Sequence, residues 1–580
     1  MSKLYSLFKK SLKLGGIFGV LSGILVGVLA FQINHFSFEF KNIFLVPFYH
    51  VLIYSTVGLL VGAVGGLLVA GTAKFISMDS SRTNPFLSKL LTLAFSLIFI
   101  LFAARLFWSF PAQKEQTKIK FDPLSVNSMH VKKGNLLQNT DSFIGVQPHF
   151  KTIVIALDAA SFSVMDSLIL EGHLPTIKSL LQNGVRAKVK TLTPTRSPVI
   201  WTSIATGKLP AEHGIWDFVL GKMPGTSFTR GRYKYPYASG MERFASFFSD
   251  IAFIPNIPYT SNLRQVKAFW NILSEYKRRI GVIGWYATFP VEPVTGFMIS
   301  DGLFFSTRYL DEKIRTTLTF PPDLIDEIES VVIDSTEITP DQLIAKLHIS
   351  PTTWQKIQQS RYFENISYLL KLTYSRDERT LALTQKLLVS DEFKNLDLLT
   401  VYFKSIDEVS HATCEEYRGE LAAHDADNQI CRENLLAVYQ QADARIAEVL
   451  KFADENTAVM ILSDHGFSYG DITGESKFGH WQGQEGVFIL SGPHIKKNYD
   501  LSEIAIFDFL PTLLYMQNMP VAIDLKGQVL LSAFEDDFID THPVRYISSF
   551  ERQSEHSDKP VQTNINKEIE KKLKSLGYIN

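Results

Sequence analysis

The chain has 580 residues, and its 58 Lys and Arg nearly balance its 59 Asp and Glu, for a formal net charge of −1. This length is enough for one large domain with additional segments. The neutral balance argues against nucleic-acid binding, which normally needs a basic domain or a basic face. The two cysteines, Cys414 and Cys431, are too few for a disulfide framework or a thiolate metal cluster, and the sequence leaves open whether they pair.

Three long apolar segments come first in the chain. Residues 14–31 and 42–73 contain no charged residue, and a third such run, 90–104, continues past Arg105. A helix that crosses the hydrocarbon core of a membrane needs roughly 20 mostly apolar residues. A cleaved signal peptide is the alternative for the first segment, but no A-x-A-like site follows it and two more apolar segments do. We therefore predict a membrane anchor over residues 1–111. Its three transmembrane helices are expected at about 14–33, 45–72 and 87–110.

The distribution of Lys and Arg predicts the orientation of this anchor. Basic residues cluster before the first segment and between the second and third, whereas the loop between the first two has only Lys41. The clustered residues are Lys3, Lys9, Lys10, Lys13, Lys74, Arg82 and Lys89. Because cytoplasmic loops carry the excess of Lys and Arg, the N-terminus is expected in the cytoplasm. Three crossings then place everything after about Pro111 outside. The chain is thus predicted to be a multi-pass membrane protein with an extracytoplasmic catalytic domain.

The character of the sequence changes at Lys151, after a polar stretch at 112–149 that we interpret as a linker. From there, short apolar runs alternate with helix-like stretches. This order is typical of an α/β domain with a mostly parallel central sheet flanked by helices. The less regular range 218–395 is interpreted as insertions over the active-site face. Strands are expected at 152–157, 185–192, 396–403, 457–464 and 486–492, and helices at 163–183 and 429–453.

Three aspartates stand at or just beyond the ends of predicted strands, and three histidines lie close to them or to a further strand. In parallel sheets, functional groups gather at the carboxyl ends of the strands, so these side chains are expected to meet. Asp407 and His411 are also spaced by about one helical turn, which places them on one helix face. Imidazole and carboxylate ligands suit zinc, manganese or iron, and the lack of cysteine ligands fits a catalytic site. The candidate ligands are Asp158, Asp407, His411, Asp464, His465 and His480.

The candidate nucleophile, Ser197, lies in the segment TPTRSPVIWTSIATGK. A serine before Pro198 is a good helix N-cap, with the proline at the first helical position. A hydroxyl there faces the free N–H groups and the positive end of the helix, a favourable place for a phosphoryl group. Because serine alone is a weak nucleophile, it needs a base or a metal, for which Asp158 is a candidate ligand. The alternatives are a simple helix cap, or Thr195 or Thr202 as the reactive hydroxyl.

In their order along the chain, these motifs resemble the alkaline phosphatase superfamily, most of all its type I phosphodiesterase/nucleotide pyrophosphatase branch. The segments KLPAEHGI and FDFLPTLLYMQNMPVAIDLKGQVL also resemble stretches of that branch. The resemblance covers about 150–535, which leaves 536–580 as a C-terminal tail. The motifs are Asp158 in IALDAASF, Ser197 in TRSPVIWTSIATG, Asp407 and His411 in FKSIDEVSH, Asp464 and His465 in SDHGF, and His480 in GHWQGQEGVFILSGP.

The resemblance implies an alkaline phosphatase-like fold and two divalent metal ions, with zinc as the expected metal. One ion would be held by Asp407, His411 and His480. The other would be held by Asp158, Asp464, His465 and Ser197. Such a site implies a phosphoric ester hydrolase of the phosphodiesterase kind, in which Ser197 forms a phosphoseryl intermediate. The expected partners are the membrane and a phosphoester substrate, which is a small molecule, a nucleotide or a lipid headgroup.

Some features depart from this pattern or leave alternatives open. Many nucleotide pyrophosphatases carry a threonine nucleophile and an asparagine three residues later; here Ser197 and Ile200 stand in those places, which weakens a nucleotide assignment. Sulfatases, which share the fold, place an arginine four residues after the nucleophile, where this chain has Trp201. Arg196 and Lys404 are candidate phosphate contacts, although an ordinary structural charge is the simpler interpretation of each.

A phosphomonoesterase and a membrane-tethered phosphotransferase also remain open, because a transferase of this kind differs only in the acceptor of the phosphoryl group. From a different class, the chain could be a catalytically inactive receptor or scaffold. The complete set of candidate ligands argues against that class, since a protein that uses only its surface has no need of seven such groups.

Overall fold

The structure is a computed structural model that describes residues 136–137, 140–222, 229–231, 256–304, 312–331, 338–346, 349–359, 363–412, 425–469, 478–479 and 485–551. Nearly all of them belong to one compact unit, formed by Ile119–Leu220, Gly231–Tyr237 and Asn256–Asn580. Of the second unit, Met1–Lys118, Gly221–Arg230 and Ala238–Pro255, the described residues are 221–222 and 229–230. The central sheet and every described candidate site residue lie in the first unit.

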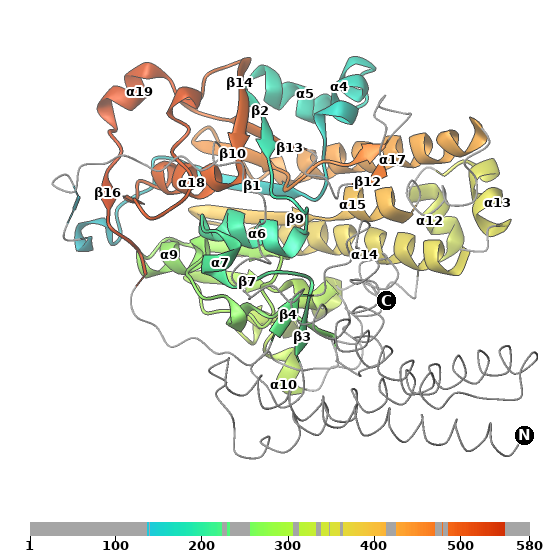
Figure 1. Cartoon of the computed structure of the whole chain (residues 1–580), viewed down its shortest axis with the longest axis horizontal. Coiled ribbons are helices and arrows are strands. Elements are labelled where there is room, and N and C mark those ends of the chain that lie inside the picture. Colours follow the sequence, from blue (N-terminus) through green and yellow to red (C-terminus); the bar gives the residue numbers. More distant parts are fainter. Residues whose placement is uncertain are drawn as a thin grey trace, which may run out of the picture. The chain divides into compact units, whose positions relative to one another are not determined.

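Nine strands form the sheet at the centre of this unit (Figure 1). They are β1 (Lys151–Leu157), β2 (Gly184–Lys190), β6 (Ile280–Ile283), β7 (Gly296–Ile299), β8 (Thr319–Phe320), β9 (Leu398–Phe403), β10 (Thr457–Leu462), β13 (Gly486–Ser491) and β14 (Tyr499–Ala505). Their order is β14-β2-β13-β10-β1-β9-β6-β7-β8. The strands β10, β1, β9, β6 and β7 are parallel neighbours, and β13 and β8 run against them. The predicted α/β fold with a mostly parallel sheet is confirmed.

The helices lie on both faces of the sheet. The longer ones and those near the site are α4 (Phe162–Leu170), α5 (Pro175–Gln182), α6 (Ser197–Thr206), α9 (Phe269–Glu275), α14 (Phe363–Leu388), α15 (Ser405–Ser410), α17 (Asp425–Leu450) and α18 (Phe509–Met516). The other described α-helices are α7 (Pro210–His213), α10 (Glu312–Arg315), α11 (Leu324–Ile328), α12 (Pro340–Lys346), α13 (Pro351–Gln359) and α19 (Asp536–Thr541). Short strands outside the sheet are β3 (Val219–Lys222), β4 (Thr229–Gly231), β5 (Asn256–Pro258), β11 (Ser468–Tyr469), β12 (Phe478–Gly479), β15 (Val521–Ala522) and β16 (Tyr546–Ile547).

Two apolar cores, one on each face, hold the helices on the sheet. Successive side chains of a strand point to opposite faces. In β1, Ile153 and Ile155 belong to the core that α4, α5, α14 and α17 cover, whereas Val154 and Ala156 belong to the core under α6, α9 and α18. Because both faces of this strand are buried, the segment is a continuous apolar run rather than an alternating one.

Two predicted elements differ from the structure. The single helix predicted at 163–183 is wrong, because the segment forms α4 and α5. The break lies at Gly172, whose φ of +83° is the left-handed conformation that favours glycine, and Pro175 then stands in the first turn of α5. Likewise, the range 218–395, predicted as insertions, supplies β6, β7 and β8 of the central sheet. These strands have two to four residues each, so they show no periodicity in the sequence.

The described domain also extends beyond 150–535 on both sides. Leu136, in the predicted linker, forms a bridge with Tyr546 of β16. β16 lies in the predicted C-terminal tail and pairs with β15. In the linker, Phe143 is also buried in the core under α18. Parts of both segments therefore belong to the folded unit.

The predicted membrane anchor cannot be compared with these elements. The helices at about 14–33, 45–72 and 87–110 lie outside the described residues. None of the helices among the described residues combines the length and the apolar composition that a membrane crossing requires. The anchor and its orientation therefore stay predictions.

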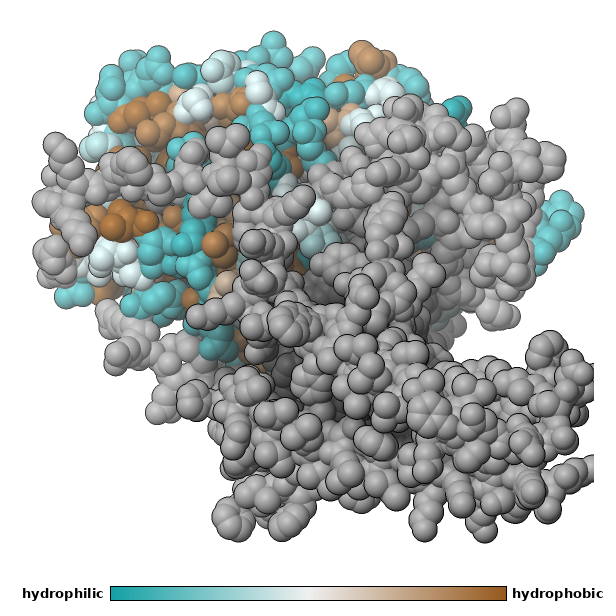
Figure 2. All heavy atoms as spheres, viewed as in Figure 1, coloured by the Kyte–Doolittle hydropathy of each residue, from teal (hydrophilic) through white to brown (hydrophobic). Residues whose placement is uncertain are grey.

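The visible surface of the described part is mixed, with hydrophilic side chains between smaller groups of hydrophobic ones (Figure 2). Exposed large hydrophobic side chains come from separate elements: Leu170 ends α4, and Val389 follows α14. Scattered apolar side chains of this kind are normal on soluble domains. They do not mark a docking surface.

Candidate active site

The candidate ligands lie where three neighbouring parallel strands end. Asp158 directly follows β1, Asp464 and His465 follow β10, and Asp407 lies in α15, which begins two residues after β9. Because β10, β1 and β9 are adjacent in the sheet, their carboxyl ends bring these side chains to one place. All four residues are fully buried.

Three groups converge on the Nε2 atom of His465. Asp464 Oδ2 lies 3.3 Å from it, Ser197 Oγ lies 3.4 Å from it and Asp158 Oδ1 lies 3.5 Å from it. The two carboxylate oxygens are buried and receive no hydrogen bond from the described residues. The convergence matches one of the two metal-ligand sets that the family resemblance implies.

The contact of the other ring nitrogen of His465, Nδ1, indicates which nitrogen carries the proton. Nδ1 lies 3.0 Å from the carbonyl oxygen of Gly466, and a carbonyl oxygen only accepts, so we assign the proton to Nδ1. Burial lowers the pKa of His465, although the charges of Asp158 and Asp407 oppose this shift, and a lowered pKa favours the neutral ring. Nε2 then carries a lone pair that faces two carboxylate oxygens. Such a set of electron-pair donors fits a divalent metal ion.

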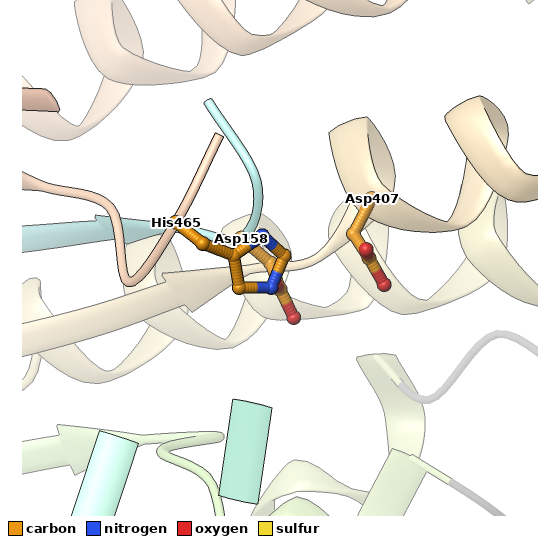
Figure 3. A group of neighbouring side chains, drawn as sticks. All are labelled: Asp158, Asp407 and His465. Carbon is orange, nitrogen blue, oxygen red and sulfur yellow. The ribbon is translucent and has the colours of Figure 1, made fainter. Parts of the chain in front are cut away.

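Asp407 and His411 form the second part of the site. Asp407 Oδ1 lies 3.3 Å from His411 Nε2, as the spacing of one helical turn predicts. One ligand atom each from Asp158, Asp407 and His465 also lie within 4.8 Å of one another (Figure 3). Burial, and then the charges of Asp158 and Asp407, raise the pKa of Asp464 well above its usual value. These buried carboxylates repel one another, and a divalent ion would relieve that repulsion.

Ser197 is the first residue of α6 rather than its N-cap, a position held by Arg196. The predicted helix start is therefore wrong by one residue, and Pro198 is still in the first turn. Of the rival hydroxyls, Thr202 donates to the carbonyl oxygen of Pro198 at 2.6 Å, within its own helix. Thr195 is buried and precedes the helix. Ser197 is thus the candidate hydroxyl for which a contact with His465 is observed.

The predicted phosphate contacts have other partners. Arg196 pairs with the buried carboxylate of Asp217. Lys404 Nζ lies 3.2 Å from Asp158 Oδ2, and the hydroxyl of Tyr402 donates to the same oxygen at 2.5 Å. His480, the seventh predicted ligand, lies outside the described residues. The two contacts on Asp158 Oδ2 leave Oδ1 as the atom directed at His465.

Tyr402 and Tyr286 are residues that sequence reasoning did not single out. Tyr402 is the penultimate residue of β9, and Lys404 lies 4.6 Å from the centre of the Tyr286 ring. Burial lowers the pKa of Lys404, but Tyr286, Asp158, Asp407 and Glu408 together outweigh burial, so the pKa lies above its usual value. A buried, charged lysine therefore accompanies the acidic cluster. Neither tyrosine had a signal in the sequence, because Tyr402 lies within the strand predicted at 396–403 and Tyr286 lies in the range predicted as insertions.

Helix α15, which carries Asp407, is held by Asp377 of the neighbouring helix α14. The buried Asp377 accepts hydrogen bonds from the backbone N–H groups of Lys404, at 3.1 Å, and Ser405, at 3.2 Å. These N–H groups begin α15, so the carboxylate caps this helix from another element. Arg445 Nη1, from α17, lies 3.6 Å from Asp377 Oδ2, so a third helix is linked to this carboxylate.

Replacing Asp377 with alanine is expected to lower the free energy of unfolding by about 3 kcal/mol. The change leaves two buried N–H groups and the Arg445 guanidinium without this carboxylate. Urea unfolding of the full chain would measure the loss. Asp391→Ala, which removes a carboxylate that is 97% exposed, is the matched control and should leave unfolding unchanged. Equal stability of the two variants would show that Asp377 does not hold α15.

Comparison with known proteins places this site in a family. The family model of the type I phosphodiesterases/nucleotide pyrophosphatases matches residues 152–499, which is more than half of the chain. The chain belongs to this family. It is therefore an enzyme, a hydrolase that acts on phosphoric ester bonds. The matched range contains every candidate nucleophile and ligand, from Asp158 to His480.

Solved structures give weaker likenesses. Murine ectonucleotide pyrophosphatase/phosphodiesterase 5, in an inactive form in complex with AMP, is 10% identical, with 64% of this chain and 95% of that chain covered and a TM-score of 0.34. Phosphonoacetate hydrolase from Sinorhizobium meliloti 1021 is 15% identical, with 56% and 57% covered and a TM-score of 0.29. No curated protein matches the chain.

Proposed function

We propose that the chain is a metal-dependent phosphodiesterase that works through a phosphoseryl intermediate on Ser197. The observation that carries the proposal is the convergence of Ser197 Oγ, Asp158 Oδ1 and Asp464 Oδ2 on His465 Nε2, at 3.3 to 3.5 Å. A hydroxyl within a cluster of metal-type ligands is the arrangement that activates a serine for attack on phosphorus. The family supports the same class of reaction.

In the proposed reaction, Ser197 Oγ attacks the phosphorus atom of a diester. The bond from phosphorus to the leaving oxygen breaks on the opposite side, and one alcohol departs. The product of this step is Ser197 esterified with the remaining phosphoryl group and its retained alcohol. Water then attacks phosphorus, which frees Ser197 and releases a phosphate monoester. The N-terminal end of α6, where Ser197 lies, would present the positive end of the helix dipole to the developing charge on the phosphoryl oxygens.

The ligand set fits two divalent ions. Asp158, Asp464, His465 and Ser197 would hold one, and Asp407 and His411, with His480, would hold the other. When bound, such ions stabilise both the attacking and the leaving oxygen of an in-line displacement. Carboxylate and imidazole ligands favour zinc, and the chain offers no thiolate at these positions. The protein's own part is to hold the carboxylates buried and to place Nε2 of His465 beside them.

A panel of chromogenic phosphate mono- and diesters, assayed with the purified full chain, would test this function. We expect turnover of a bis-aryl or alkyl-aryl diester that exceeds turnover of the matched monoester. Preference for the monoester would assign a phosphomonoesterase instead. Transfer of the phosphoryl group to an added alcohol in preference to water would assign a phosphotransferase. Absence of turnover with every ester would contradict the proposal.

We also propose that the catalytic domain lies outside the cytoplasm. Besides the distribution of Lys and Arg, Cys431 in α17 supports this placement, because it takes part in a disulfide bond. The other cysteine of the chain, Cys414, lies outside the described residues. Structural disulfides are typical of oxidising compartments and rare in the cytoplasm.

Reporter fusions at about residue 130 would test the topology. A reporter that works only outside the cytoplasm should be active there, because three predicted crossings precede this position. A cytoplasmic reporter at the same place should be inactive. A second fusion at about residue 80, between the second and third predicted helices, is the control and should give the opposite pattern. Cytoplasmic activity at residue 130 would contradict the predicted orientation.

A further inference from the structure

Asp158 has two oxygens with different surroundings. Oδ1 faces His465 Nε2 and receives no hydrogen bond from the described residues. Oδ2 is held by two groups from the end of β9, the hydroxyl of Tyr402 at 2.5 Å and the ammonium of Lys404 at 3.2 Å. Oδ1 is thus placed to bind a metal ion, whereas Oδ2 is already bound by two protein groups.

Lys404 is positioned firmly. Its side chain is 3% exposed, and its Nζ lies 4.6 Å from the centre of the Tyr286 ring. Its backbone N–H is bound by Asp377, so the residue is fixed at both ends. Removing a lysine from water costs free energy that a contact with carboxylates must offset. The placement therefore points to a role in balancing the acidic cluster.

The charges of the cluster suggest what that role is. Asp158, Asp407 and Asp464 bring three carboxylates to one buried place, and a metal ion and the Lys404 ammonium are both cations that would lie beside them. Like charges at short distance in a buried site repel strongly. The lysine and the metal must therefore compete for the same carboxylates.

We propose that Lys404 is a built-in counter-ion of the metal site, which stabilises the metal-free fold and weakens metal binding. Tyr402 is its neutral companion, which orients Asp158 without adding charge. Lys404 is thus a positioning residue that acts through Asp158. This inference rests on the proposed metal site. It predicts that loss of Lys404, a residue beside the site, raises the affinity for the metal ion.

The test compares Lys404→Met with the wild type, each as the purified full chain stripped of metal by a chelator. Zinc affinity is measured by competition with a chelating dye, and stability by thermal unfolding with and without zinc. In Lys404→Met we expect zinc affinity to rise about tenfold or more. We expect the metal-free melting temperature to fall by about 4 °C or more. Added zinc should restore most of the lost stability, because it replaces the missing cation.

Four variants control this test. Lys404→Gln removes the charge and keeps a polar side chain, so it should behave like Lys404→Met. Lys404→Arg keeps the charge and should stay near the wild type. Tyr402→Phe removes a neutral donor from the same oxygen and should not tighten zinc binding. Lys208→Met removes a different buried lysine, whose Nζ lies 2.7 Å from Asp524, and should lower stability without changing zinc affinity.

The outcomes separate the two proposals. If the wild type binds no zinc or other divalent ion, the proposed metal site is wrong. If the wild type binds zinc and Lys404→Met binds it equally or more weakly, only the counter-ion role is wrong. If Lys404→Met and Lys404→Gln both fail to fold even with zinc present, Lys404 has a general structural role, and the counter-ion role is again wrong. Folding of either variant only with zinc would support it.

Discussion

Replacing Ser197 with alanine is expected to lower turnover of a phosphodiester by several orders of magnitude, on the order of 10⁴-fold. The hydroxyl that would attack phosphorus is lost, and with it the covalent step. The fold should survive, because Ser197 is one small residue in the first turn of α6. Steady-state kinetics on one diester, with circular dichroism to check folding, would measure the effect.

Two neighbouring hydroxyls provide the controls for this experiment. Thr202→Ala removes a hydroxyl that donates to Pro198 within the helix, and Thr195→Ala removes one that precedes it. Both variants should keep most of the activity. Near-normal turnover in the Ser197 variant, or collapse only in the Thr195 variant, would show that the nucleophile is misplaced.

Removal of the metal ions is the change with the second largest expected effect. We expect about two divalent ions per chain, most of them zinc, and loss of activity when a strong chelator removes them. The expectation rests on buried carboxylate oxygens of Asp158 and Asp464 that face the lone pair of His465. Elemental analysis before and after chelation, followed by zinc addition, would measure both content and recovery.

A ligand variant makes the metal prediction specific to this site. His465→Ala should lower the zinc content by about one ion per chain, because it removes the atom on which three other ligands converge. His173→Ala, which removes a partly exposed histidine elsewhere, should leave the content unchanged. A wild type without bound metal, or full activity in the presence of the chelator, would contradict this account.

The sheet was predictable because its central strands are long and buried on both faces. The continuous apolar runs that became β1, β9, β10 and β13 needed no knowledge of contacts far apart in the chain. The strands β6 and β7 have four residues each and lie in a range rich in aromatic residues and proline. β6 joins the sheet by pairing with β9, and β7 joins it by pairing with β6, and a single sequence displays neither pairing.

The candidate site was likewise predictable from the sequence only in part. Asp158, Asp464 and Asp407 were predictable because each follows a strong strand signal, and the ends of parallel strands meet. The partners Tyr402 and Asp377 were not. Tyr402 looked like one more apolar residue of a strand, and Asp377 caps a helix that begins 28 positions later, at Ser405. Contacts of this kind depend on tertiary packing and have no periodicity of their own.

The most direct test of the central claim is a search for the covalent intermediate on Ser197. The full chain is mixed with a slowly hydrolysed aryl diester, quenched in acid within one turnover, digested and analysed by mass spectrometry. The peptide carrying Ser197 is expected to gain the mass of the phosphoryl group with its retained alcohol, and this species should be absent from Ser197→Ala. Release of the aryl alcohol in a burst, with no modified peptide or with the modification on another residue, would contradict the central claim.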